Sequence, residues 1–273
     1  MRIVLCFAWP AEAKPWLKRV NCKLRFQVKH MRYYQGADYD ILIAGMGPYH
    51  LPAAIGWIQG LIPEDKIWWN IGIAGGKENQ LHQWFYISSV TNERGADFFY
   101  PEISILPNMP LGMLQTSAQP VSKTVLAAAD TLADMEGFAF CMAAQLFAST
   151  SRIQLLKWVS DNGVENFDKH SWQKKYADSM DEPLQLIQAH HKKIASMVVT
   201  TKPDIDVYLQ PLLYALRPTF SQQVMIKDAL YFARQYHGND YIQKRIAAIP
   251  QDLKQKKEKN VWLLQLLNEL RNV

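Results

Sequence analysis

The chain has 273 residues, of which 49% are apolar, 20% charged and 12% aromatic, and this composition excludes disordered and fibrous proteins. The formal net charge of +5 is too small to indicate a nucleic-acid partner, and residues 202–273 hold four of these five excess charges. Because domains hold about 100 to 200 residues, we expect one large domain with a smaller, basic appendage.

The amino-terminal segment predicts a strand followed by a helix. Residues Ile3–Trp9 form a short apolar run like the core of a signal peptide, but Pro10 ends the run early, so we interpret Arg2–Ala8 as a buried first strand. Good helix-forming residues then extend from Ala13 to Val20. Glu12 therefore lies at a strand-to-helix junction, a place that faces ligands in α/β proteins.

The following segments alternate strand and helix patterns, which is typical of an α/β fold around a largely buried sheet. We predict a helix over Pro48–Leu61 and strands over Leu24–Tyr34, Asp40–Gly45, Lys66–Ile73 and Gln83–Val90. The third of these strands ends in the glycine turn Ala74-Gly75-Gly76. The stretch Asn92–Leu114 has little periodicity and several prolines, so we expect an irregular loop beside a pocket.

The last part of this α/β region has two predicted helices, Val121–Asp130 and Ala133–Ala148, and a final buried strand, Ile153–Val159, which leads into Ser160-Asp161. Beyond it the strand signal fades. Helices are predicted over Pro183–Val199, Asp204–Leu216, Ser221–His237, Asp240–Ala248 and Asp252–Asn272. We therefore expect an α/β domain over residues 1–199 and a helical extension over residues 200–273.

The extension carries apolar stripes on its predicted helices, which we expect to pack against the main domain. The alternatives are oligomerisation, covering of a pocket, or nucleic-acid contact through the lysine-rich run near residue 256. A lysine run is more often a solvated helix face, so we expect no nucleic-acid partner.

Acidic residues lie where the predicted elements end. Glu12 follows the first strand, Asp134 and Glu136 lie at a helix start, and Asp161 follows the last strand. Carboxylates at strand ends can converge on one crevice, where burial and repulsion push their pKa values apart into acid and base roles. Each could instead cap a helix or form a turn. A dinucleotide site is excluded, because the third glycine of the Gly45-x-Gly47 pattern would fall at His50.

Three motifs resemble a known family. The segments Ala133–Ala139 (ADMEGFA), Asn70–Gly76 (NIGIAGG) and Ser160-Asp161 are similar to the nucleoside phosphorylase superfamily, and closest to methylthioadenosine/S-adenosylhomocysteine nucleosidases. Gly45–Gly47 opening a helix and the loop Gly95–Tyr100 match the family in order and spacing. The likeness covers roughly residues 1–199.

The resemblance implies a three-layer α/β/α fold with a mixed central sheet that cleaves the N-glycosidic bond of a purine nucleoside of the 5′-substituted adenosine type. By the same resemblance, Met135 packs against the ribose and Glu136 accepts hydrogen bonds from its hydroxyls. Asp161, with Ser160 beside it, protonates or hydrogen-bonds the leaving purine at N7. Glu12 is the base for the attacking water. An oxocarbenium-like transition state needs these groups.

The resemblance also implies a base-binding segment at 116–121 and an aromatic wall. Pro120 stands where the nucleosidases stack an aromatic ring on adenine, so adenine is not assured. Val121 offers backbone hydrogen bonds, and Phe98 or Tyr100 supplies an aromatic surface. Ala74 and Gly75, in a glycine turn that offers backbone donors, are further predicted substrate-binding residues.

The nucleophile is water or phosphate. Phosphorylases hold a dianion with arginines, and the two glycine turns contain none, although Arg32 and Arg94 remain available. Lys157 replaces a family arginine and keeps only its charge. We expect hydrolysis, with phosphorolysis or nucleoside binding without turnover as alternatives.

The resemblance and the composition together set the remaining expectations. We expect a small-molecule nucleoside substrate, no cofactor, no metal and no membrane partner, and a homodimer or higher homo-oligomer. The three cysteines, Cys6, Cys22 and Cys141, form no paired motif, which favours a reducing compartment, the cytoplasm.

Overall fold

A computed structural model describes residues 1–122, 126, 131–163, 171–198, 205–248, 250 and 255–271. The chain divides into two compact units, Met1–Ala195 and Ser196–Val273, each with its own hydrophobic core. Residues 199–204 lie outside the described ranges, so the predicted domain boundary at 199/200 stays a prediction. No helix in these ranges is long and apolar enough to cross a membrane.

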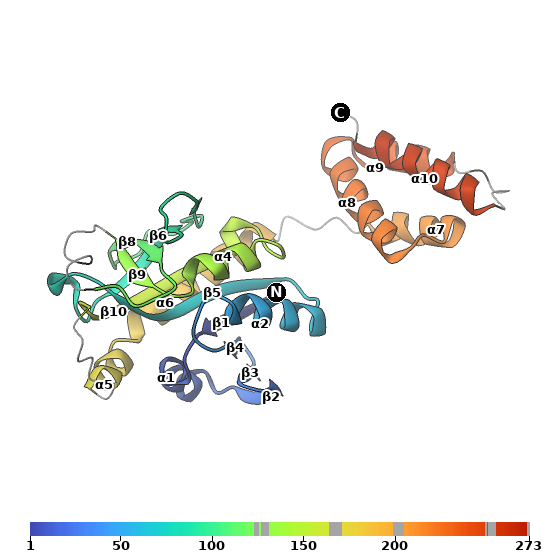
Figure 1. The fold of residues 1–273 in the computed structure, drawn as a ribbon. Helices are drawn as coiled ribbons and strands as arrows, with labels where there is room; N and C mark the ends of the chain where they lie inside the picture. The colour runs from blue at the N-terminus through green and yellow to red at the C-terminus, as the bar shows by residue number, and fades with distance from the viewer. Residues whose placement is uncertain are drawn as a thin grey trace. The chain divides into compact units, whose positions relative to one another are not determined.

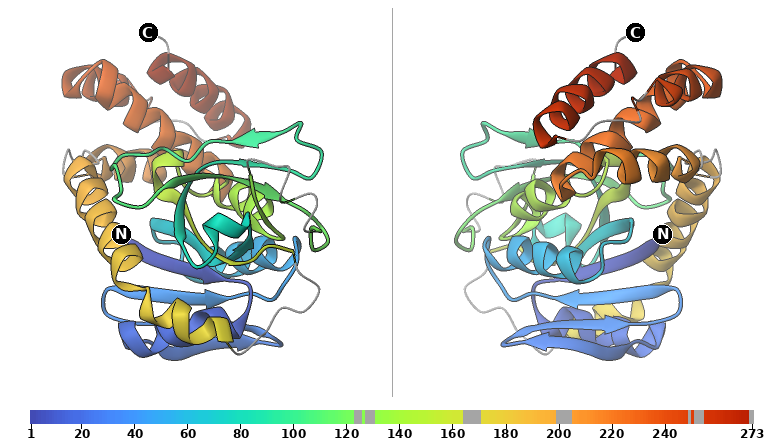
Figure 2. Two further views of the ribbon diagram at one scale, coloured as in Figure 1. Left: turned by 90° about the vertical axis from the view of Figure 1, so that its left-hand side faces the viewer. Right: turned by 90° about the vertical axis from the view of Figure 1, so that its right-hand side faces the viewer.

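The first unit is built on one ten-stranded mixed sheet, which can be followed along the arrows in Figures 1 and 2. Its strands are β1 (Arg2–Phe7), β2 (Lys23–Val28), β3 (Met31–Gln35), β4 (Tyr39–Ile43), β5 (Lys66–Gly75), β6 (Trp84–Thr91), β7 (Phe98–Phe99), β8 (Leu111–Thr116), β9 (Leu132–Asp134) and β10 (Ile153–Asp161). The order is β10-β6-β8-β9-β5-β1-β4-β3-β2, and β7 pairs with β6. Because β5 also pairs with β10, the first five strands of this order close into a ring.

Helices cover both faces of this sheet. They are α1 (Pro10–Val20), α2 (His50–Leu61), α4 (Gly137–Ala144), α5 (Ser171–Asp178) and α6 (Asp181–Val198). Apolar residues of α2 and α4 belong to one core cluster, and those of α1, α5 and α6 belong to another on the opposite face. The predicted three-layer α/β/α arrangement is therefore confirmed.

Three segments differ from their predicted elements. Leu24–Tyr34 is the hairpin β2–β3, because the chain reverses at Lys29, whose φ of 52° is unusual for a residue with a side chain. Asn92–Leu114 contains β7 and the start of β8, both paired with β6. Ala133–Ala148 is split, with β9 ending at Asp134 and α4 beginning at Gly137, so the intervening pair stands at a junction. The prediction for Val121–Asp130 lies mainly outside the described residues.

The second unit contains α7 (Asp206–Leu216), α8 (Phe220–Tyr236), α9 (Asn239–Ala247) and α10 (Lys256–Arg271). Its core is formed by leucine, isoleucine, alanine and tyrosine side chains from all of these helices. A capping box begins α8, since Thr219 Oγ1 accepts from Gln222 N while Gln222 Oε1 accepts from Thr219 N. The predicted helical extension is confirmed over the described residues.

Candidate active site

Four parallel strands bring their carboxyl ends to one edge of the sheet. β1 is parallel to both β4 and β5, and β5 is parallel to β10. The segments that leave these ends carry the residues of interest, because α1 follows β1 and α2 follows β4. In α/β proteins ligands bind at such an edge.

Glu12 lies in the first turn of α1 and is held from two directions. Its Oε2 accepts from Trp9 N at 3.0 Å, which caps the helix, and its Oε1 accepts from Ile73 N of β5, also at 3.0 Å. The residue is only 5% exposed. Burial raises the pKa of Glu12 above its ordinary value, although the Ile73 N–H opposes this shift. A raised pKa makes the carboxylate a stronger base.

Gly72 leaves the room that the Glu12 carboxylate occupies. A Cβ at Gly72 would lie 2.9 Å from Glu12 Oε1, closer than real Cβ contacts. Gly72 also pairs in register with Lys157 of β10. The first glycine of the NIGIAGG motif, Gly72, is thus explained by the close approach of the Glu12 side chain to the backbone of β5.

A buried ion pair lies next to this carboxylate. Lys157 Nζ is 2.8 Å from Asp134 Oδ2, and the two side chains are 2% and 1% exposed. Asp134 also accepts from Thr116 Oγ1 at 2.7 Å and from Gly137 N at 2.9 Å. Burial lowers the pKa of Lys157, but the neighbouring carboxylates, Asp134 first, raise it by more, so its pKa ends above the ordinary value. Lys157 is therefore a cation among three carboxylates.

Glu136 is the third of these carboxylates and precedes α4 directly. Its Oε1 accepts from Gly47 N at 2.7 Å, which ties the β9–α4 junction to the turn between β4 and α2. Gly47 has a φ of +99°, a conformation that favours glycine. Burial and the Asp134 charge raise the pKa of Glu136 to about 7, and Lys157 limits the shift.

Asp161 ends β10 beside the last residues of β5. Its Oδ2 accepts from Ser160 Oγ at 2.7 Å, and its Oδ1 accepts from Gly163 N at 2.9 Å. Ser160 Oγ also lies 3.4 Å from the Ala74 carbonyl oxygen. A register shift between Val159 and Asp161 breaks the regular pairing with β5 at this point. The carboxylate is thus fixed by its own strand end.

β5 connects these groups. Ile73 N binds Glu12, and Gly75 pairs in register with Asp161. At about 3.3 Å per residue, these two positions on β5 are roughly 7 Å apart. The structure therefore places Glu12 and Asp161 along the last residues of the same strand. The cluster can supply a base, a group that holds a proton, and hydrogen-bond acceptors for hydroxyls.

The other predicted site residues are more dispersed. Met135 is half-buried at the junction before Glu136, and Val121 is half-buried after β8. Phe98 and Tyr100 are 53% and 63% exposed, and their rings stack on each other with centroids 6.0 Å apart. These two aromatic residues therefore offer an open surface.

Two hydrogen-bond donors to the site carboxylates were not predicted from the sequence. The Gly47 N–H that holds Glu136 and the Thr116 hydroxyl that holds Asp134 both come from segments far away in the chain. A sequence signal exists only for the first, since a glycine pair between a strand and a helix often exposes backbone donors.

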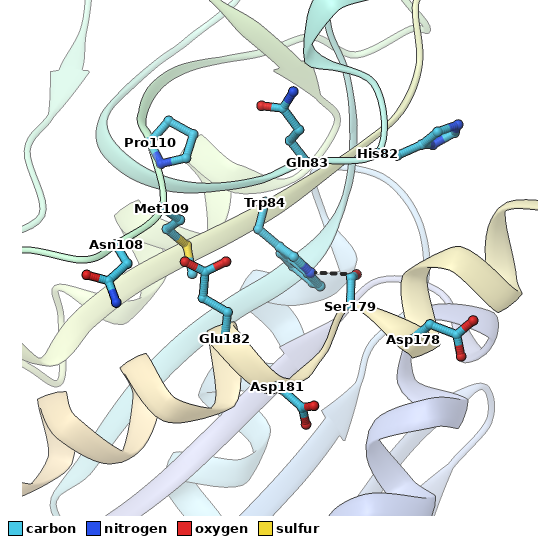
Figure 3. Close-up of a pocket in the computed structure, with 10 residues that line it drawn as sticks. All are labelled: His82, Gln83, Trp84, Asn108, Met109, Pro110, Asp178, Ser179, Asp181 and Glu182. Carbon is cyan, nitrogen blue, oxygen red and sulfur yellow. Dashed lines mark hydrogen bonds between the residues drawn. The ribbon is translucent and has the colours of Figure 1, made fainter.

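A separate, open cavity of about 470 Å³ lies between the start of β6, the segment before β8 and the α5–α6 junction (Figure 3). Trp84 Nε1 donates to Ser179 Oγ at 2.9 Å on its wall. Its lining includes none of Glu12, Glu136 and Asp161. We therefore identify the polar cluster as the candidate active site, because it gathers the buried carboxyl groups of Glu12 and Glu136, whose pKa values are both raised, at the edge where the parallel strands end.

Comparison with known proteins gives structural neighbours only. No family model matches the sequence, and no curated protein does. The apo structure of 5′-methylthioadenosine nucleosidase from Arabidopsis thaliana is 19% identical, with a TM-score of 0.58 over 69% of this chain and 95% of that one. The present chain therefore has a nucleosidase-like fold.

Two further neighbours are Asp-to-Asn variants. The methylthioadenosine nucleosidase of Chlamydia trachomatis bound to methylthioadenosine is 22% identical, with a TM-score of 0.54 over 69% of this chain and 98% of that one. The Helicobacter pylori enzyme with 5′-methylthioadenosine in its active site is 13% identical, with a TM-score of 0.56 over 70% and 98%. The fold that the sequence motifs implied is confirmed, over a share close to the length of the first unit.

Proposed function

We propose that the first unit hydrolyses the N-glycosidic bond of a purine nucleoside of the 5′-substituted adenosine type, releasing the free base and a ribose derivative. The observation that carries this proposal is the cluster at the ends of β5 and β10, in which the buried Glu12 and Glu136 and the half-buried Asp161 each accept hydrogen bonds from identified donors. The nucleosidase fold of the neighbours supports it.

The leaving base is the first task of such a site. Asp161 delivers a proton to the purine, N7 by the family resemblance, as the bond to the anomeric carbon breaks. Ser160 orients its carboxyl group through the 2.7 Å hydrogen bond. Val121 contacts the base, and Phe98 and Tyr100 provide the aromatic surface.

The sugar is the second task, because positive charge develops on the ribose as the bond breaks. The Glu136 carboxylate accepts hydrogen bonds from the ribose hydroxyls and stabilises that charge, and Met135 packs against the ring. Glu12 removes a proton from the water that attacks the anomeric carbon. Ala74 and Gly75 border the same space through their backbone.

Water is favoured over phosphate by one contact. The Ile73 N–H, a backbone donor suited to an anion, is already bound to Glu12 Oε1. The two candidate arginines lie on other elements, since Arg32 is half-buried on β3 and Arg94 is exposed in the loop after β6. The glycine turns at 45–47 and 72–76 themselves contain no arginine. These features support hydrolysis.

The experiment is a substrate panel in labelled water. Purified protein is incubated with methylthioadenosine, S-adenosylhomocysteine, adenosine and inosine in H₂¹⁸O, with and without phosphate, and free base and sugar are analysed by mass spectrometry. Base release without phosphate, with ¹⁸O on the sugar, is expected. Release that requires phosphate indicates a phosphorylase. Thermal stabilisation by a nucleoside without cleavage indicates a binding protein. If no nucleoside is cleaved and none stabilises the protein, the proposal is overturned.

Assembly and compartment are part of the same proposal. We infer a homodimer or higher homo-oligomer, and a cytoplasmic protein, since Cys6, Cys22 and Cys141 are free thiols. Light scattering on the wild type tests the assembly, because a monomeric wild type would contradict it.

A further inference from the structure

Two imidazoles that the proposed reaction does not use meet beside the turn Gly45–Gly47. His30 Nε2 lies 3.0 Å from His50 Nδ1, and the two rings stand at 87° with centroids 4.7 Å apart. His30 follows the β2–β3 reversal, and His50 is the first residue of α2. His30 is exposed and His50 is half-buried, so solvent reaches the pair.

Gly45 holds this pair in place. Its φ is +112°, and a Cβ there would lie 2.8 Å from His30 Cδ2, 2.9 Å from His30 Nε2 and 3.2 Å from His50 Cγ. Both rings therefore rest against the bare Cα of a residue whose backbone conformation also favours glycine. The two nitrogens are positioned by packing, which limits the freedom that a ligand would otherwise have to remove.

We propose that His30 and His50 chelate one divalent transition-metal ion, with Cu²⁺ bound most tightly. Imidazole nitrogens bind such ions at about 2.1 Å, so two of them at right angles around one ion stand roughly 3.0 Å apart. This is the separation observed. Imidazole suits copper, nickel and zinc, and Cu²⁺ forms the most stable complexes of this series.

Binding requires one change of tautomer. In the free pair one ring nitrogen donates its proton to the other, whereas the metal takes the lone pairs of both. The donating ring therefore moves its proton, through solvent, to its second nitrogen, so that this step neither adds nor removes a proton. No group of three or more His, Cys, Asp or Glu side chains in the described ranges is arranged for a metal. The remaining positions thus go to water or to a small exogenous donor.

The site is connected to the candidate active site through a single turn. Gly47 N donates to Glu136 Oε1 at 2.7 Å, and the Gly47 carbonyl accepts from His50 N at 3.4 Å. A metal that bridges His30 and His50 braces this turn against α2 and the β2–β3 hairpin. The metal site itself does not rest on the proposed nucleosidase activity.

The test is a Cu²⁺ titration of the full, untagged chain, followed by calorimetry and by electron paramagnetic resonance. One ion per chain with two nitrogen ligands is expected. His30→Ala and His50→Gln should each weaken binding at least tenfold, while His82→Ala, a control at another exposed histidine, should leave it unchanged. Circular dichroism verifies that each variant folds.

Two results would overturn the proposal. One is an affinity in both His30→Ala and His50→Gln within twofold of the wild type. The other is a resonance spectrum with a single nitrogen ligand, which would assign the metal to one side chain or to the amino terminus. Because no nucleoside is present, the outcome is independent of the substrate panel.

Discussion

The two units differ in what their cores contain. The second unit has an apolar core of leucine, isoleucine, alanine and tyrosine, whereas every buried polar or charged residue of the described chain lies in the first. Among them are Glu12, Asp134, Glu136 and Lys157, all at one edge of one sheet. Buried charges cost free energy unless each is paired and hydrogen-bonded. The first unit therefore has a buried charged cluster, as the proposed activity requires, whereas the core of the second unit is apolar.

The cost is limited by specific partners. Asp134 receives three donors, from Lys157, Thr116 and Gly137, and Glu12 receives two backbone N–H groups. The pKa values of Glu12 and Glu136 are nevertheless raised, because these donors offset only part of the free energy that burial of a carboxylate costs. Substitutions in each unit can test whether the charged cluster of the first unit affects activity while the apolar core of the second unit affects only stability.

The largest expected effect is on catalysis. Glu12→Gln keeps the size of the side chain and one of its two hydrogen-bond acceptors but removes the base, so the rate of base release should fall about 10²- to 10⁴-fold. Steady-state kinetics with the best nucleoside of the panel measures it. Glu182→Gln, an exposed position on α6, is the matched control. A Glu12→Gln rate within threefold of the wild type would exclude Glu12 as the base.

The second expected effect is on stability in the first unit. Lys157→Met removes the cation from a buried pair and leaves Asp134 without its counter-charge, which should lower the free energy of unfolding by about 3 to 5 kcal/mol. Urea denaturation measures this change. The double variant Lys157→Met/Asp134→Asn should recover part of the loss. If Lys157→Met alone is as stable as the wild type, the pair is not a structural requirement.

The third prediction concerns the second unit. Leu266 is 1% exposed in its core, so Leu266→Ala should cost about 2 to 5 kcal/mol of unfolding free energy. The rate of base release, measured below the unfolding temperature, should stay unchanged. A large loss of activity in folded Leu266→Ala protein would mean that the second unit takes part in the reaction.

The smallest expected effect is a pH dependence. The pKa of Glu136 is about 7 in the folded chain, against an ordinary 4.5, so the folded state holds a proton that the unfolded state loses in this window. Stability should therefore fall as pH rises from 4.5 to 7, by up to about 3 kcal/mol. Urea denaturation at several pH values, compared with Glu136→Gln, isolates this contribution. Parallel curves for the two proteins would contradict it.

The sequence predicted those elements whose pattern is local. β1, β5 and β10 are largely apolar segments with few polar interruptions, as expected of strands buried on both faces, and the helices of the second unit show clear apolar periodicity. The hairpin at Lys29 was missed because no glycine or proline marks it. β8 was missed because its pairing with β6 and β9, rather than any alternation, makes it a strand.

The candidate site was predictable in part for the same reason. Glu12 and Asp161 follow strand ends that the sequence reveals, so their convergence could be expected. The 2.8 Å contact of Lys157 with Asp134 and the hold of Gly47 on Glu136 join segments far apart in the chain. Such contacts depend on strand order, which one sequence does not define.

The proposed role of Asp161 as proton donor is tested by comparing base release by Asp161→Asn with base release by the wild type. The substitution keeps the shape of the side chain at the end of β10 but removes the carboxyl proton donor. We expect the wild type to release free purine, and Asp161→Asn to do so at least about 100 times more slowly while still being thermally stabilised by the same nucleoside. Equal rates of base release by the two proteins would contradict it.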